Sequence, residues 1–341
     1  RLVREVRGTE GAPYMAVSVA KKPMDFSFIN ITQYGTAAVV NRQETFSGLL
    51  DAFYAGRDRI ERMRARSQDL LRVLSNASDR LSRKINIQRA ELEKCAERDQ
   101  LRICGDLISA NLYQIEKGST VVSLQNFYEP DAPLVKIKLD PSKTPSQNAQ
   151  KYYKDYRKAR TAEEKLTEQI GQAQQELEYL DTVFEELSRA KVERDLSEIR
   201  QELVEQGYIR AQKGKQKPVA AAAPLEFTSS DGFRILVGRN NRQNDRLTLK
   251  QANNNDIWLH TKNIPGSHTI LVTDGREPTE TAIREAAMLA AAHSRARDSS
   301  QVPVDYTQVR NVNKPSGAKP GMVIYVKYNT VYVTPAASEE V

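Results

Sequence analysis

The sequence predicts an α+β protein in which a long antiparallel coiled-coil hairpin carries a small α/β insert at its tip and precedes a compact α+β domain. Three observations predict this fold class. Apolar residues follow heptad-like spacing in two long segments, strand-like patterns interrupt the region between them, and strand and helix patterns mix after a polar linker. A chain of 341 residues is long enough for two or three such domains.

The two long helices are predicted from the spacing of their apolar residues, which recur at steps of three, four and seven, as in a coiled-coil seam. The first series is Phe53, Ile60, Met63, Leu70, Leu74, Leu81, Ile85, Leu92 and Cys95. The second is Ala159, Leu166, Ile170, Ala173, Leu177, Leu180, Phe184 and Leu187. Two helices of similar length around one insert most simply fold back on each other. A parallel coiled-coil dimer is the alternative, but it would leave the insert unable to return the chain.

The insert between the helices has a different pattern. Residues 121–124 and 134–139 are β-branched or alternating, which predicts two strands. Thr144 or Ser146 can cap the returning helix. A module carried on two helices of this length suits a protein that reaches across a large assembly, and a passive spacer is the alternative.

The returning helix is expected to end near Gln206 and Gly207, before a flexible basic linker over 211–224. The domain beyond it is expected to contain an alanine-rich helix over 279–294, capped by Thr279 or Thr281. The strands predicted outside the insert are 14–20, 26–31, 233–237, 269–272, 322–326 and 330–333, the last two forming a terminal hairpin around residues 327–329.

Charge is distributed unevenly along the chain, whose net charge is +7. Residues 210–341 contain 18 lysines and arginines against 12 acidic residues, whereas residues 46–209 contain 27 against 28. A basic terminal domain predicts a polyanion partner, with solubility as the alternative explanation. No apolar run approaches the roughly 18 residues of a membrane span.

Catalytic motifs are absent from the sequence. There is no GxSxG, no GxxxxGK[ST] and no GxGxxG after a strand. His260, His268 and Asp256 have no HExxH or CxxC around them, and two cysteines supply no zinc site. We therefore expect no catalytic site, no cofactor and no metal, and a metal-dependent nuclease built on the two histidines is a distant alternative. Trp258 is either a core anchor or a base-stacking platform.

Polar residues concentrate in three segments of the terminal domain. Residues 238–245 bring amide and guanidinium groups directly after a strand, the chemistry that contacts phosphate and sugar, or else form an ordinary polar loop. The segments 260–268 and 313–321 contain Gly266 and Gly317, which permit close backbone approach or a positive φ. We expect these two loops to adjoin one another. His260 and His268 would then donate hydrogen bonds to RNA or protein, or act as structural struts.

Long motifs in the chain resemble those of the NFACT family. LVGRNNRQND, DIWLHTKNIPGSH and KPSGAKPGMVIYVKYNTVYVTP are similar, in this order, to motifs of its RNA-associated domain. GDLISANL, FYEP, LDPSKTPSQNAQKYYKDYRKA and IRQELVEQGYIR resemble its coiled-coil and middle regions. The resemblance runs from about Phe46 to Pro335.

The resemblance implies six segments and a set of RNA-binding residues. The segments are 1–45, the remainder of an N-terminal domain; 46–104, the first coiled-coil helix; 105–146, the middle module; 147–209, the second coiled-coil helix; 210–224, the linker; and 225–335, the RNA-associated domain. The expected RNA-binding residues are Arg239, Asn240, Asn241, Arg242, His260, Lys262, His268, Lys314 and Lys319. The chain begins at Arg1 without a methionine, which predicts a fragment that lacks most of the family's N-terminal domain and its tRNA-discriminating residues.

The same resemblance implies a function in ribosome-associated quality control. Such a factor binds an obstructed large ribosomal subunit and its ribosomal RNA, and recruits tRNA so that the stalled chain gains an untemplated C-terminal alanine tail. It is expected to be cytoplasmic and ribosome-associated, without a conventional active site. A surface-displayed adhesin that binds fibronectin is the alternative and could be a second role of the same protein.

Overall fold

The computed structural model describes residues 11–18, 22–211 and 222–336. Most of the expected linker, residues 211–224, lies outside this range. The chain divides into two compact units, one formed from residues 1–74, 183–313 and 323–341, and the other from residues 75–182 and 314–322.

The helices differ from the two continuous ones that were expected over 46–104 and 147–209. The structure has α2 (Phe46–Cys95), α3 (Arg98–Ala110), α4 (Pro145–Arg189) and α5 (Glu193–Glu205). The break before α5 has a clear cause, because Val192 is extended (φ −129°, ψ 155°) and Asp195 Oδ2 accepts hydrogen bonds from the backbone N–H groups of Lys191 (3.0 Å) and Val192 (3.2 Å). Asp195 thus starts a new helix.

In the second unit, the two strands predicted in the insert are present. They are β4 (Val121–Gln125) and β5 (Leu134–Lys138), which pair antiparallel. Thr144 caps α4 as predicted, since its Oγ1 accepts a 3.2 Å hydrogen bond from Gln147 N and Gln147 Oε1 accepts a 2.9 Å bond from Thr144 N. The side chains of Gln88 and Gln169 form a 2.6 Å hydrogen bond, and Arg98 pairs with Glu163.

The first unit contains a small three-stranded antiparallel sheet in the order β2-β1-β3. Its strands are β1 (Tyr14–Ser18), β2 (Pro23–Ser27) and β3 (Ala38–Arg42). β1 matches the predicted 14–20 segment, of which residues 19–20 lie outside the described range, whereas β2 shares only residues 26–27 with the predicted 26–31 segment, whose residues 28–31 are not strand. The third was not predicted.

The C-terminal part of the first unit is built on a six-stranded antiparallel sheet in the order β13-β10-β8-β9-β7-β6. Its strands are β6 (Leu225–Thr228), β7 (Arg234–Val237), β8 (Ile257–Thr261), β9 (Thr269–Val272), β10 (Val302–Gln308) and β13 (Asn329–Val333). The predicted strands 233–237 and 269–272 match β7 and β9 within one residue.

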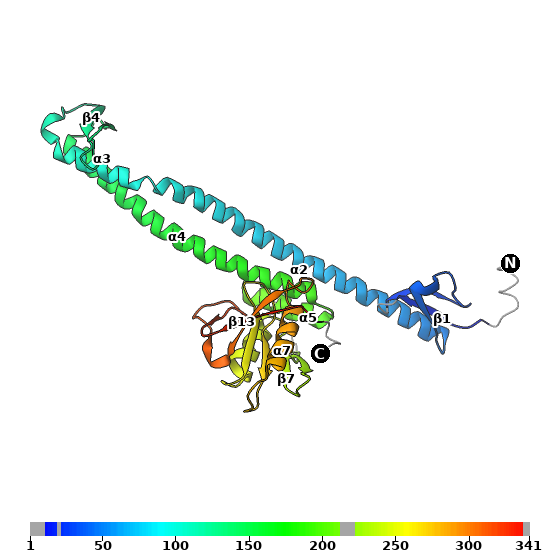
Figure 1. Ribbon diagram of the computed structural model, residues 1–341. Helices are drawn as coiled ribbons and strands as arrows, with labels where there is room; N and C mark the ends of the chain where they lie inside the picture. The colour runs from blue at the N-terminus through cyan, green and yellow to red at the C-terminus, as the bar shows by residue number, and fades with distance from the viewer. Residues whose placement is uncertain (1–10, 19–21, 212–221, 337–341) are drawn as a thin grey trace. The chain divides into compact units, whose positions relative to one another are not determined.

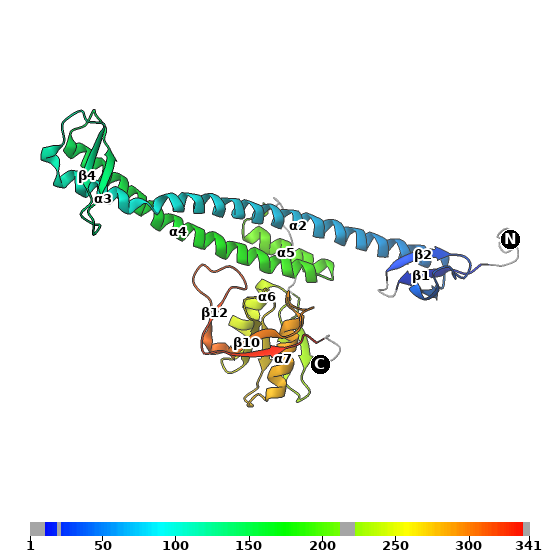
Figure 2. The same ribbon diagram turned by 45° about the horizontal axis from the view of Figure 1, so that its top comes forward.

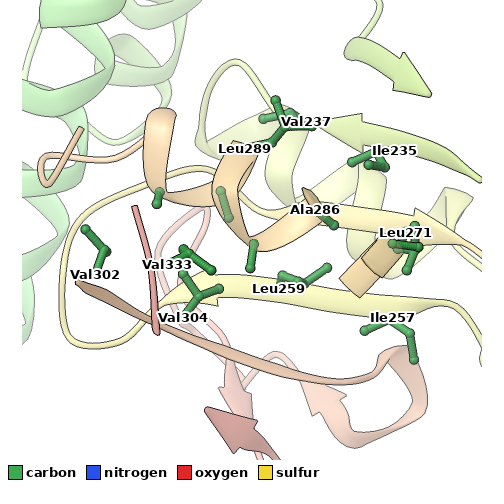
Figure 3. Packing of buried hydrophobic residues seen from close by; sticks show 14 of the residues in the cluster. Ile235, Val237, Ile257, Leu259, Leu271, Ala286, Leu289, Val302, Val304 and Val333 are labelled. Atoms are coloured by element: carbon green, nitrogen blue, oxygen red, sulfur yellow. The ribbon is translucent and has the colours of Figure 1, made fainter. Parts of the chain in front are cut away.

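Helix α7 (Glu280–Ala292) covers one face of this sheet, as Figure 1 shows. Thr279 caps the helix as predicted, because its Oγ1 accepts a 3.0 Å hydrogen bond from Ala282 N. The alanines let α7 approach the sheet closely, and Leu289 and Ala286 pack with Leu259, Val304 and Val333 (Figure 3).

The other face of the sheet is covered by α6 (Asn241–Arg246) and a π-helical segment (Leu247–Gln251), so that α6 and α7 lie on opposite sides of β10 (Figure 2). A second apolar cluster fills this face, around Trp258, Leu247 and Ile270. Trp258 is therefore a core residue.

The predicted terminal hairpin is wrong. β12 (Ile324–Tyr325) pairs with β11 (Val312–Asn313), whereas β13 pairs with β10. Residues 326–328 separate two different sheets, and Lys327 adopts a positive φ of 52° there. None of the helices in the part of the chain that the structure describes has the length and apolar character needed to cross a bilayer.

Candidate nucleic-acid interface

An acidic face of α5 meets the start of α6. Glu198, Glu202 and Glu205 are four and three residues apart, so they lie on one side of α5. Asn240 Nδ2 donates a 2.6 Å hydrogen bond to Glu198 Oε2, and Asn241 Nδ2 donates a 3.3 Å bond to Glu202 Oε1. The next residue continues the series, because Arg242 Nη2 lies 3.5 Å from Glu205 Oε1. Three consecutive residues thus pair with three acids along one helix face.

The predicted RNA-binding residues of this segment differ in how deeply they are buried. Asn240 and Asn241 are buried, and Asn240 also caps α6 by accepting a 2.9 Å bond from Gln243 N. Arg239 and Arg242 are half-buried, so their guanidinium groups keep access to solvent. The two amides therefore hold α5 against the sheet domain, and the two arginines are the members of this segment available to a phosphate.

The two predicted histidines lie around Trp258 on the α6 side of the sheet. His260 belongs to β8 and its ring stacks on Trp258 at 5.7 Å and 12°, whereas His268 meets the Trp258 ring edge-on at 5.2 Å. His268 is buried, its Nδ1 is 2.8 Å from Thr248 Oγ1, and its backbone N–H donates to Asn244 Oδ1. Burial lowers the pKa of His260 below its ordinary value. This packing favours the strut role over direct RNA contact.

Gly266 and Gly317 each meet one of the two requirements expected at these positions, which are close backbone approach and a positive φ. A Cβ on Gly266 would lie 2.8 Å from Thr261 Oγ1 and 2.9 Å from Ser294 Cβ, so this position requires close approach. Gly317 has open space around it but a φ of 77°, which a side chain rarely adopts.

Lys262 lies at the edge of the sheet, just after β8, beside a buried carboxylate. Its Nζ is 3.6 Å from Asp305 Oδ1, 3.4 Å from Thr330 Oγ1 and 5.0 Å from the centre of the Tyr328 ring. Asp305 also accepts a 2.8 Å hydrogen bond from Tyr325 Oη and a 2.6 Å bond from Thr330 Oγ1. Burial, followed by this bond to Asp305, raises the pKa of Tyr325. The Asp305 carboxylate thus holds the side chains of Lys262, Thr330 and Tyr325 close together.

Exposed aromatic rings lie beside this point. Tyr328 and Tyr332 are 45% and 60% exposed, so both residues are accessible to a ligand. We call Lys262, Tyr325, Tyr328, Thr330 and Tyr332 the edge surface. Aromatic rings interleaved with a cation are the chemistry that binds single-stranded nucleic acid.

Lys314 and Lys319 belong to the second compact unit. The ammonium of Lys319 lies 5.4 Å from the centre of the Tyr179 ring of α4. The expected adjacency of the loops 260–268 and 313–321 stays a prediction. Within the described residues, no group of three or more His, Cys, Asp or Glu side chains is arranged to hold a metal ion.

Sequence reasoning did not identify Asp305, Tyr325, Tyr328, Thr330 or Tyr332 as functional. A signal was present in the alternation of VPVDYTQ and NTVYV, which places Asp305 and Thr330 on one face as register partners. The sequence does not show that β10 and β13 pair with each other, and this pairing is what brings the residues together.

Comparison with known proteins identifies the family. The model of the NFACT N-terminal and middle domains matches residues 1–221, and the model of the NFACT protein RNA binding domain matches residues 224–327. A Bacillus subtilis (strain 168) protein named Rqc2 homolog RqcH is 46% identical over 299 residues, covering 87% of this chain and 52% of the relative. A Streptococcus suis (strain 05ZYH33) protein of the same name is 36% identical over 293 residues, covering 86% and 52%.

The chain thus spans about half the length of the curated relatives it matches. It is also similar to a solved structure, the C-terminal of the fibronectin/fibrinogen-binding protein from Streptococcus suis, with a TM-score of 0.65 and 32% identity over 81% of this chain and 96% of that one. Because one family model matches more than half of the chain and a second matches most of the rest, this protein belongs to the NFACT family.

Proposed function

We propose that this chain binds RNA on the ribosome as part of a ribosome-associated quality-control factor. The observation that carries the proposal is the edge surface, where exposed tyrosines and a lysine surround a buried carboxylate. Support comes from the match of residues 224–327 to the NFACT RNA binding domain and from relatives named as Rqc2 homologues.

In this proposal the edge surface holds a single-stranded or looped segment of ribosomal RNA. Tyr328 and Tyr332 stack on bases, each stack contributing about 1–3 kcal/mol. Lys262 contacts a phosphate, and Asp305 holds the lysine in place without neutralising it fully because Tyr325 and Thr330 share the same carboxylate. Arg239 and Arg242 add further phosphate contacts, and residues 225–335 act as the RNA-associated domain.

We also propose that α2 and α4 form an intramolecular antiparallel coiled coil that carries the module over 105–146. Gln88 of α2 contacts Gln169, and Arg98, ten residues further on at the start of α3, contacts Glu163, six residues earlier on α4. Pairs whose numbers run in opposite directions support antiparallel helices. Such an arm would let the factor span the large subunit, recruit tRNA and support untemplated alanine tailing of the stalled chain.

Co-sedimentation with large ribosomal subunits in sucrose gradients tests the proposal. The wild-type chain should travel with the subunit at low salt and dissociate as salt rises, because phosphate contacts depend on counterion release. A Tyr328→Ala, Tyr332→Ala double variant should dissociate at lower salt, whereas the matched Tyr328→Phe, Tyr332→Phe variant keeps the rings and should behave as wild type. Equal binding by all three proteins would reject the edge surface as the RNA site.

Fibronectin binding is the second candidate function, because the chain resembles a structure named for binding fibronectin and fibrinogen. The same preparations should be passed over immobilised fibronectin. Saturable binding there, together with no association with the large subunit, would favour an adhesin displayed at the cell surface over the cytoplasmic ribosome-associated role.

A further inference from the structure

A cleft of about 640 Å³ lies in the first unit, beside the buried pairing of α5 with α6. It is bounded by the last turn of α4, the link to α5, the start of β6 and the end of α7. Four of its lining side chains are cationic: Arg189, Lys191, Arg239 and Arg297. The rest of the lining includes an apolar wall formed by Ile199, Leu225, Ala292, Pro335 and Ala336.

The four cations surround one imidazole, that of His293, which also lines the cleft. Burial, followed by repulsion from Arg189, Lys191, Arg239 and Arg297, lowers the pKa of His293 to about 4. These residues come from three places in the chain, 189–191, 239 and 293–297, and all of them line the same cleft.

The acidic groups at the cleft do not balance this charge. Glu185 pairs with both Arg189 (3.4 Å) and Arg297 (2.8 Å), so one carboxylate serves two guanidinium groups. Glu186 is fully buried, and burial together with neighbouring carboxylates raises its pKa well above the ordinary value, which favours the uncharged acid. Asp195 is used by the backbone at the start of α5, and Asp298 is 95% exposed with its carboxylate 4.0 Å from Arg297 Nε.

One buried polar group at the cleft has no partner. Among the described residues, His293 Nε2 is buried and makes no hydrogen bond, whereas Lys191 is exposed. An unpaired buried polar group costs about 1–3 kcal/mol, and its usual explanation is a bound water, ion or ligand. Surplus positive charge and an unpartnered buried nitrogen in one cleft indicate an anionic ligand.

We propose that this cleft binds the phosphate monoester of a nucleotide, either a free nucleotide or the phosphorylated end of an RNA strand. Its volume is that of a small-ligand site, its cations suit a dianion, and its apolar wall suits a ribose and base. Glu186 and His293 also line the cleft and offer further hydrogen-bonding groups. The site is separate from the edge surface, shares only Arg239 with the proposed RNA contacts, and does not require the ribosome.

Calorimetric titration of the whole chain with AMP, adenosine and inorganic phosphate tests the site. AMP should bind at least tenfold more tightly than adenosine. A Lys191→Ala, Arg239→Ala double variant should weaken AMP binding tenfold or more. Arg284→Ala removes an exposed arginine of α7 outside the cleft and is the matched control, which should bind AMP as wild type does. AMP binding that is equal in all three proteins, or no tighter than adenosine binding, would overturn the proposal.

A second measurement locates the ligand and separates its two sources. The chain has three histidines, so NMR can follow each imidazole, and a bound phosphate should raise the pKa of His293 without moving His260 or His268. RNA oligomers with a 5′-phosphate should reproduce the shift if RNA ends are the source, whereas 5′-hydroxyl oligomers should not. If neither AMP nor the phosphorylated oligomer moves His293, or if a glutamate-rich peptide binds the cleft more tightly than both, the nucleotide assignment is wrong.

Discussion

The amide of Asn240 donates a 2.6 Å hydrogen bond to the carboxylate of Glu198, and both side chains are buried. The other Glu198 oxygen accepts a 2.9 Å bond from Ala222 N. A carboxylate that loses water on folding must recover hydrogen bonds inside the protein, and Asn240 supplies one of them. Through this pair, α5 at the end of the long helical region contributes a side chain to the interior of the sheet domain.

Asn240→Ala is expected to lower the free energy of unfolding by about 1.5–5 kcal/mol. The variant loses the cap on α6, about 0.5–2 kcal/mol, and leaves the buried Glu198 carboxylate short of a donor, about 1–3 kcal/mol. Urea unfolding followed by the fluorescence of Trp258, the one tryptophan of the chain, measures the change. Asn255→Ala, at an exposed turn position, is the matched control and should stay within about 0.5 kcal/mol of wild type. Equal stability of both variants would contradict the docking role of Asn240.

Lys262 and Tyr332 should affect RNA binding in different ways. Lys262→Gln removes one phosphate contact and should reduce the slope of log affinity against log salt by about 0.7 for single-stranded RNA. Tyr332→Ala removes a stack and should weaken affinity by about 1–3 kcal/mol with the slope unchanged. Fluorescence anisotropy with an RNA oligomer that lacks terminal phosphates at several salt concentrations separates the two effects and avoids the nucleotide cleft. A change of slope in Tyr332→Ala, or none in Lys262→Gln, would refute this division of roles.

His293 should make the sheet domain less stable in acid. Its pKa is about 4 in the folded state against an ordinary 6.5, so between these values the unfolded chain binds a proton that the folded chain does not. Stability is therefore lost as pH falls from 6.5 towards 4, by about 3 kcal/mol in total. His293→Gln should flatten this part of the curve in urea unfolding measured across pH. Glu186, whose raised pKa acts in the opposite direction, is present in both proteins and largely cancels in the difference. Parallel curves with a constant offset would show that His293 does not titrate as expected.

The helices α2 and α4 should be joined within one chain by a disulfide placed at their contact. Gln88→Cys with Gln169→Cys puts two thiols where a 2.6 Å side-chain hydrogen bond now lies, with Cys95 and Cys104 changed to Ser to remove competing thiols. Oxidation at low protein concentration should give a faster-migrating monomer on non-reducing gels. Gln88→Cys with Thr167→Cys is the control and should crosslink poorly, because Thr167 is exposed and, two residues before Gln169, lies on nearly the opposite side of α4. A product made only of dimers would support the parallel coiled-coil alternative.

The sequence predicts local elements well where the pattern itself decides them. Thr144 and Thr279 are helix caps as expected, because capping depends on a few neighbouring residues. The paired strands of the insert and β9 follow from β-branched runs of the right length. The break at residues 190–192 was missed because no glycine or proline marks it, and only the side chain of Asp195 shows that the helix restarts.

Long-range pairing limits the prediction of the site. The terminal hairpin is wrong because adjacent strands do not have to pair, and β13 gains more by completing the sheet next to β10. The polar run 238–245 has the composition of an RNA-contacting loop, yet Asn240 and Asn241 point into the protein because Glu198 and Glu202, about forty residues earlier, reach them. Composition indicates which groups can bind phosphate, but it does not tell which of them are already bound by another part of the same chain.

The three-against-three pairing of α5 with residues 240–242 also determines where the chain can be cut. Sequence similarity separates the two family segments near residue 222, after α5 has ended. A fragment that starts there would lack α5, so Asn240 and Asn241 would lose Glu198 and Glu202 as hydrogen-bond acceptors. The smallest part of the chain that folds on its own should therefore begin before α5, at about residue 183. The segment defined by sequence similarity and the unit that folds cooperatively thus begin at different residues.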